Sequence, residues 1–182
     1  MSVVFPDDPG FWDPAKFLPM MKVRAKSGRI EPFNLWDPQK ILAAAVVIAY
    51  KERKWIAHVK PRQEGSSTFF TALAYQHTAF RPGCRSAIMA HKKDTASYLA
   101  SVAVRFHKHT PEAIKPKKTA GLKRTLEFPA LDSRMTVDTV RGDEPLRGET
   151  VQVLLATEIS SWAENLGPEA WTAALNAVAD QS

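Results

Sequence analysis

Residues 60 to 68 combine one glycine, two consecutive serines and a threonine with basic side chains, and they read KPRQEGSST. A helix that begins in such a segment directs free backbone N–H groups and the positive end of its dipole at an anion. Gly65 would let the backbone approach a phosphate closely. The hydroxyl of Ser67 could bind Mg²⁺. The pattern therefore predicts a phosphate-binding loop.

This loop departs twice from the common pattern G-x-x-x-x-G-K-[ST]. Lys60 stands where the first glycine would be, and Ser66 stands where the lysine would be. The lysine normally holds a positive charge over the β- and γ-phosphates. Lys60 or Arg62 could supply that charge from the other end of the loop, and Thr68 could line the site. The same residues also suit an ordinary turn at a helix start, and the loop alone does not separate the two interpretations.

The flanking residues predict the elements that would position this loop. Apolar periodicity, caps and breakers predict helices at about 38–51, 67–80, 95–108 and 168–179. Short apolar runs predict strands at 55–60, 86–91, 125–128, 135–138 and 151–156. Alternation of strands and helices favours a mainly parallel sheet in a layered α/β domain.

Composition limits the class of protein. The chain has 182 residues, fits one domain and is 45% hydrophobic, enough to bury a core. The first 35 residues are rich in proline and aromatic residues, which predicts an irregular arm with a short helix near 14–21 that packs on the body. The single cysteine, Cys84, excludes an intramolecular disulfide. The longest apolar run, 41–50, is about half a membrane span.

The net charge of +6 is concentrated in one segment. Five basic residues and no acidic residue lie between Lys115 and Arg124. Such a segment can attract a polyanion by releasing counterions, and it can equally be a solvated loop.

The loop, with Phe69 and the Ala-rich helix after it, resembles the phosphate loop of large terminase subunits, the ATPases that package DNA in tailed bacteriophages. In that family the lysine is often displaced to the front of the loop, as Lys60 is here. The stretch from Phe80 to Ala96 is similar to the family's second strand and following helix. The resemblance implies a P-loop NTPase-type three-layer domain with a mainly parallel central sheet.

A second match runs from Arg147 to Trp162. It is similar to the terminase pattern of Arg-Gly, a hydrophobic strand and an acidic pair. The family's strand usually ends in Asp-Glu, in which the Asp orders the Mg²⁺ shell and the Glu activates water. Here Thr157 replaces the Asp, and Glu158 keeps the Glu position. Arg147 corresponds to an arginine that stabilises transition-state charge in a neighbouring subunit.

A third match, at 32–39, resembles the adenine-recognition segment, with Gln39 as the reader of the base and Phe33 or Trp36 as stacking partners. The resemblance thus implies catalytic roles for Glu158 and Arg147 and metal ligation by Ser67 and Thr157. The implied nucleotide contacts are Gln39, Lys60, Arg62, Gln63, Gly65, Ser66, Ser67 and Thr68.

The resemblance implies ATP and Mg²⁺ as cofactors. It also implies double-stranded DNA, a portal protein and a small terminase subunit as partners, a homo-oligomeric ring and the host cytoplasm as the location. We expect an arm at 1–35 and an ATPase domain at 36–182 that is truncated at its C-terminus, without the coupling strand or the nuclease domain. The alternative is a non-catalytic fragment that binds DNA or partner subunits through the basic segment.

Overall fold

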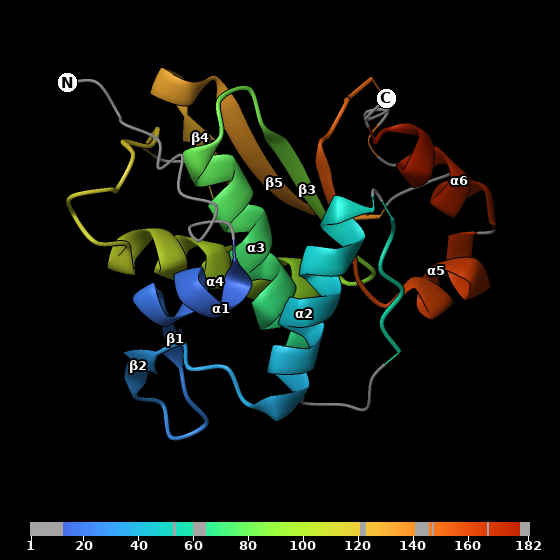
Figure 1. The fold of residues 1–182 in the computed structure, drawn as a ribbon. Helices are drawn as coiled ribbons and strands as arrows, with labels where there is room; N and C mark the ends of the chain where they lie inside the picture. The colour runs from blue at the N-terminus through green and yellow to red at the C-terminus, as the bar shows by residue number, and fades with distance from the viewer. Residues whose placement is uncertain are drawn as a thin grey trace.

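The computed structural model describes residues 13–52, 54–59, 65–120, 123–140, 146, 148–166 and 168–178 (Figure 1). The helices are α1 (Pro14–Phe17), α2 (Asp37–Lys51), α3 (Ser66–Phe80), α4 (Lys93–His109), α5 (Ile159–Leu166) and α6 (Pro168–Asn176), with 3₁₀ turns η2 (Leu18–Met20) and η3 (Pro129–Leu131). The strands are β1 (Lys22–Arg24), β2 (Ile30–Pro32), β3 (Arg85–Ala90), β4 (Thr125–Phe128), β5 (Ser133–Thr139) and β6 (Val153–Ala156). None of the helices described is long and apolar enough to cross a membrane.

The main sheet has the strand order β4-β5-β3-β6. β3 is parallel to both β5 and β6, whereas β4 is antiparallel to β5. Only η3 and one further residue separate β4 from β5, and a connection this short can join only antiparallel strands. The chain is thus a mixed α/β domain with a mostly parallel four-stranded sheet flanked by helices, which confirms the predicted fold class at this level.

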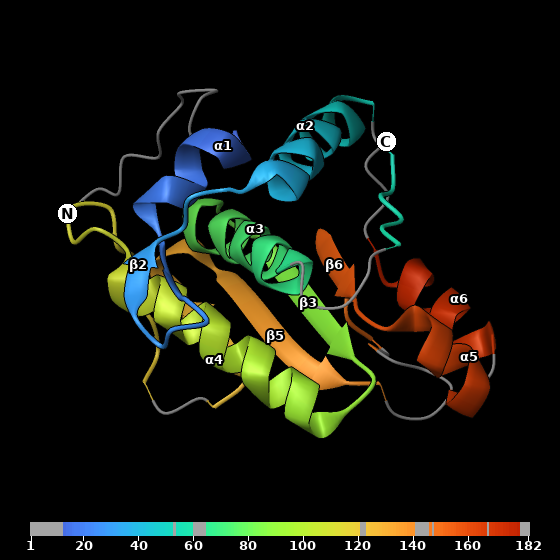
Figure 2. The same ribbon diagram turned by 90° about the horizontal axis from the view of Figure 1, so that it is seen from below.

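Helices α3 and α4 cover one face of the sheet (Figure 2). Burial alternates along β5, in the pattern of a strand with one face against the core. Leu126, Phe128, Met135 and Val137 of β4 and β5 belong to the cluster that includes Phe69 of α3 and Phe106 of α4. This cluster is the main core of the domain.

A second, smaller cluster joins β3 to α5 and α6. Met89 of β3 packs with Trp162, Ala170 and Ala174, and the indole of Trp162 is fully buried. Leu154 and Ala156 of β6 contact the same cluster. Met89 and Ile88 therefore belong to different clusters, because successive side chains of β3 point to opposite faces.

The N-terminal arm is part of the main core. Phe17, Leu18, Met21 and Phe33 are all at most 4% exposed. Phe33 stacks on Phe106 of α4, with ring centroids 6.1 Å apart. The prediction that the arm packs on the body is confirmed for residues 13–35, the part of the arm that the structure describes. The antiparallel β1–β2 hairpin and helix α5 were not predicted.

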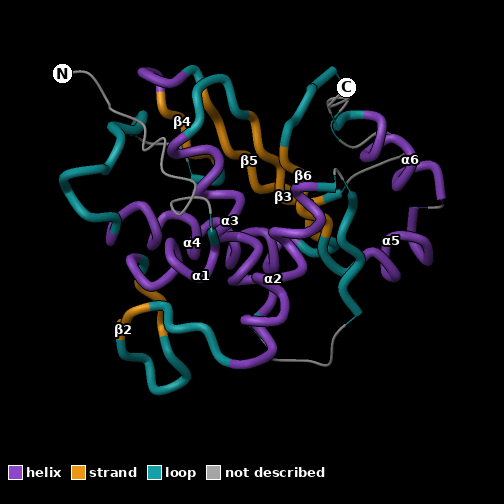
Figure 3. Tube along the Cα trace, viewed as in Figure 1, coloured by secondary structure: helices purple, strands orange, loops and turns teal. Residues whose placement is uncertain are grey.

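The predicted strand at 55–60 is wrong over the part that the structure describes. Residues 54–59 form no strand, and Figure 3 shows them as a loop between α2 and α3. The side chain of Trp55 is 59% exposed and that of Val59 is 98% exposed. A short apolar run indicates a buried strand only where neighbouring strands can pair with it. Among the described residues, β6 pairs with β3 alone and 54–59 pairs with no strand.

Candidate functional site

Gly65, the N-cap of helix α3, has left-handed backbone angles (φ 69°, ψ 10°). A β-carbon at this position would lie 2.9 Å from Nε2 of Gln39. Glycine is therefore required both by the backbone conformation and by the close approach of a neighbouring side chain. No side chain of the described residues caps α3, so its first N–H groups can bind another acceptor.

The residues after Gly65 differ in their surroundings. Ser66 is 1% exposed, and its hydroxyl lies 3.1 Å from Nε2 of His58. Ser67 and Thr68 are half-buried. The backbone carbonyl of Ser67 accepts a hydrogen bond from the hydroxyl of Thr71. Ser66 is thus held by the protein itself, whereas Ser67 is the more accessible of the two hydroxyls.

His58 is a site residue that the sequence did not reveal. Its ring bonds to Ser66 and lies 6.3 Å from the ring of Phe70. The apolar run around it predicts a strand, in which a histidine has no functional role. A histidine eight residues ahead of a serine at a helix start carries no recognisable spacing signal.

Gln39 of α2 lies directly against the start of α3. Its side-chain amide donates to the carbonyl of Gly65 at 3.4 Å. Gln39 is 3% exposed, and its Oε1 is buried without a hydrogen-bond partner among the described residues. Of the two residues expected to stack on the adenine base, Phe33 is buried against Phe106 and Trp36 is 47% exposed. The structure thus brings Gln39 to the loop while keeping it closed from solvent.

Thr157 and Glu158 directly follow the last residue of β6. The backbone N–H and the hydroxyl of Thr157 both donate to the carbonyl of Met89, at 2.9 and 3.3 Å. The indole N–H of Trp162 donates to the carbonyl of Thr157. These bonds fix the position of Thr157, which is 9% exposed.

Glu158 is exposed and has a left-handed φ of 57°. Such a conformation is uncommon for a residue with a β-carbon and costs on the order of 1–2 kcal/mol. The next residue begins α5, so the strained residue joins β6 to the helix. The carboxylate is free to reach a ligand at the end of the sheet.

Topology places these two segments at the same edge of the sheet. A short turn at 81–84 joins the C-terminal end of α3 to the start of β3, and α3 packs back across the sheet. The start of α3 therefore lies toward the carboxyl ends of β3 and β6, where Thr157 and Glu158 follow (Figure 2). In open α/β sheets, ligands bind at this edge.

Four of the predicted site residues lie outside the described residues, so their roles stay predictions. These are Lys60, Arg62 and Gln63 of the loop and Arg147. The structure consequently describes the glycine, hydroxyl and carboxylate components of the candidate site and not its basic components.

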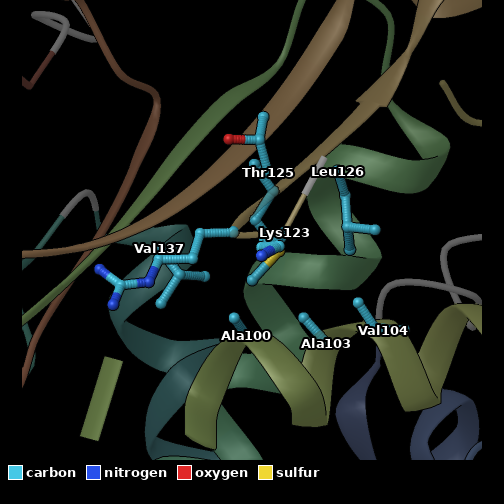
Figure 4. A pocket seen from close by; sticks show the side chains of 9 residues that line it. Ala100, Ala103, Val104, Lys123, Thr125, Leu126 and Val137 are labelled. Atoms are coloured by element: carbon cyan, nitrogen blue, oxygen red, sulfur yellow. The ribbon is translucent and has the colours of Figure 1, made fainter. Parts of the chain in front are cut away.

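Two hollows on the surface are lined by residues other than those of the candidate site. The first lies between α4 and the β4–β5 pair, where Ala100, Ala103 and Leu126 point into it (Figure 4), and its volume is about 10 Å³. That volume accommodates one water molecule. The second, about 230 Å³, is lined by Arg85, Asp132, Arg134 and other residues at the opposite ends of the strands. Neither is lined by Gly65 or Glu158.

The thiol of Cys84 is buried, and desolvation raises its pKa despite hydrogen bonding to Ser86 and the charge of Arg81. Within the described part of the chain, no three His, Cys, Asp or Glu residues are grouped so as to hold a metal ion.

No protein-family model and no curated protein sequence matches this chain.

Proposed function

We propose that this chain is the ATP-binding and hydrolysing part of a large terminase subunit, which drives DNA into a viral procapsid. The observation that carries the proposal is the arrangement of Gly65, the uncapped start of α3 and Glu158 at one edge of the sheet. Backbone N–H groups at a helix start bind phosphate, and a carboxylate at the end of a neighbouring strand can activate water.

The proposed roles follow the matched motifs. Lys60 and Arg62 contact phosphates, Gln63, Gly65, Ser66 and Thr68 line the loop, and Gln39 reads adenine. Arg147 completes the site of a neighbouring subunit in a ring. Oε1 of Gln39 is buried beside Gly65 without a hydrogen-bond partner among the residues that the structure describes, which fits a residue that pairs once a ligand opens the contact.

The described hydroxyls fit Mg²⁺ only weakly without a substrate. Ser67 offers one hydroxyl, and the hydroxyl of Thr157 already donates to Met89. Mg²⁺ keeps several waters and is commonly held by few protein ligands together with substrate phosphates. Ser67 and Thr157 would therefore hold a Mg²⁺ ion that arrives together with ATP. The ion would neutralise the negative charge of the ATP phosphates during hydrolysis.

Titration with a fluorescent ATP analogue tests the proposal. We expect Mg²⁺-dependent binding that Ser67→Ala weakens by more than Ser101→Ala, a matched serine on the far helix α4. Glu158→Gln should bind the analogue normally and abolish turnover in the complete motor protein, whereas Glu169→Gln should leave turnover intact. Equal binding by Ser67→Ala and Ser101→Ala, or full turnover by Glu158→Gln, would reject the assignment.

One observation favours the second candidate, a non-catalytic module that binds DNA or partner subunits through the basic segment 115–124. The segment that precedes the phosphate loop is exposed and pairs with no described strand, so the loop lacks the strand that normally anchors it. The same titration separates the two candidates: absence of Mg²⁺-dependent nucleotide binding together with salt-sensitive DNA binding supports the module.

A further inference from the structure

Basic residues from three separate segments meet at the C-terminal end of α4. The β1–β2 hairpin packs on α4, and the loop after α4 continues from the same end (Figures 1 and 2). Residues 22–32 and 105–118 together hold nine lysines and arginines and two glutamates. The formal charge of these two ranges, +7 with histidines neutral, exceeds the net charge of the whole chain, +6. We call these two ranges the basic surface.

Two histidines at the end of α4 are close enough to these charges for all three segments to influence their pKa values. Burial lowers the pKa of His109, and the charges of Lys22, Lys108, Arg105 and Lys115 lower it further. Burial and the charges of Lys118 and Lys115 lower the pKa of His107 to about 4, against a small opposing effect of Glu112. Lys22 is on the hairpin, Lys108 on α4 and Lys115 on the loop, so all three segments contribute to one field.

Most of these cations form no ion pair with another residue that the structure describes. Lys115 forms an ion pair with Glu112, and among the described residues no other lysine or arginine of the basic surface has one. Lys22, Arg24, Lys26, Arg29, Lys108 and Lys117 are exposed. Keeping so many like charges close together without partners costs folding stability, and a polyanion would relieve that repulsion.

We propose that the basic surface binds the phosphate backbone of duplex nucleic acid. The charge density suits a polyphosphate, and release of the duplex's counterions supplies the driving force. Binding of single strands relies on aromatic side chains on which bases stack. The exposed aromatics of the described chain, Trp36, Tyr50, Trp55 and Tyr98, lie outside the basic surface, which favours a duplex contacted through its backbone.

This surface shares Lys115, Lys117 and Lys118 with the basic segment 115–124 and adds residues of the hairpin and of the end of α4, so the inference deepens the second candidate function. Arg124 lies outside it and is held by Asp138 and Ser97. The basic surface instead includes the hairpin, which sequence reasoning did not detect. The inference needs no nucleotide and does not depend on the proposed ATPase activity.

Fluorescence anisotropy with a labelled mixed-sequence DNA duplex, without nucleotide, tests the inference on the full chain. The logarithm of the affinity should fall linearly with the logarithm of salt concentration, with a slope of about −0.9 per phosphate contacted. The double variant Lys108→Gln, Lys117→Gln should bind more weakly and reduce the slope by about two. Lys22→Gln with Lys26→Gln, on the hairpin, should do the same.

The matched control is Lys92→Gln with Lys93→Gln, which removes two exposed charges at the opposite end of α4. Its slope should equal that of the unmodified chain. The inference is overturned if the control and the two surface variants lose affinity equally. The inference is also overturned if the protein binds a single strand of the same length more tightly than the duplex. It is likewise overturned if the protein binds vesicles that contain phosphatidylserine and does not bind the duplex. Unchanged ATP-analogue binding by the surface variants would separate this result from the fate of the proposed ATPase.

Discussion

The contact between Gly65 and Gln39 allows a sharp test of the start of α3. Gly65→Ala introduces a β-carbon in a left-handed conformation, which costs about 1–2 kcal/mol. The new carbon would also lie 2.9 Å from Nε2 of Gln39. Nε2 of Gln39 is at the end of a side chain that is flexible but buried. We therefore expect the clash to destabilise the fold by about 1 kcal/mol, at the low end of what overpacking costs.

Gly83→Ala is the matched control. Gly83 has nearly the same φ, 67°, and a β-carbon there would meet nothing within 4 Å. Both substitutions carry the same conformational cost and the same loss of unfolded-state entropy, so their difference isolates the contact with Gln39. Gly65→Ala should therefore melt roughly 2–4 °C below Gly83→Ala in a chain of this size.

A double substitution completes the measurement. In a Gln39→Ala background, Gly65→Ala should lose its extra cost, which gives a coupling free energy of about 1 kcal/mol from urea unfolding. Equal melting temperatures for Gly65→Ala and Gly83→Ala, or a coupling near zero, would refute the claim that Gln39 closes on this loop. The comparison requires no nucleotide, so it tests the geometry separately from the function.

Two further predictions concern the core. Tyr75→Phe removes a buried hydroxyl that lies 2.6 Å from Oγ1 of Thr110 and 3.4 Å from Nδ1 of His107. We expect this substitution to lower the free energy of unfolding, measured in urea, by about 1–2 kcal/mol. Tyr98→Phe, at an exposed position, is the control and should leave that free energy almost unchanged. Burial lowers the pKa of His77 and of His107 to about 4, so the unfolded chain binds more protons than the folded chain between about pH 6.5 and 4. The free energy of unfolding should be highest above pH 6.5 and fall as pH decreases to 4; a rise over that interval in urea titrations would contradict the burial of both rings.

Much of the fold could be predicted because its elements carry local signals. The alternation of buried and half-buried residues in β5 and the apolar period of α4 each mark one face. The hairpin escaped prediction because β1 and β2 have three residues each and are rich in charge. The strand predicted at 55–60 failed because a run of apolar residues does not specify a pairing partner.

The candidate site was predictable to a lesser extent. Gly65 was recognisable because left-handed backbone favours glycine, and Thr157 and Glu158 were recognisable because they end an apolar strand. The burial of Gln39 and the bond between His58 and Ser66 depend on how α2 meets α3, a tertiary contact between residues far apart in sequence. The roles of Lys60, Arg62 and Arg147 rest on the resemblance alone.

The position of β6 has a consequence for how the domain opens. β3 is hydrogen-bonded to a strand on each side. Among the strands that the structure describes, β6 is hydrogen-bonded to β3 alone. Amide hydrogens in β3 are therefore protected until the whole domain unfolds, while those of β6 can exchange through detachment of one strand. Because Thr157 and Glu158 are attached to β6, such a sub-global opening would remove the carboxylate from the sheet edge and leave α3, β3 and β5 folded.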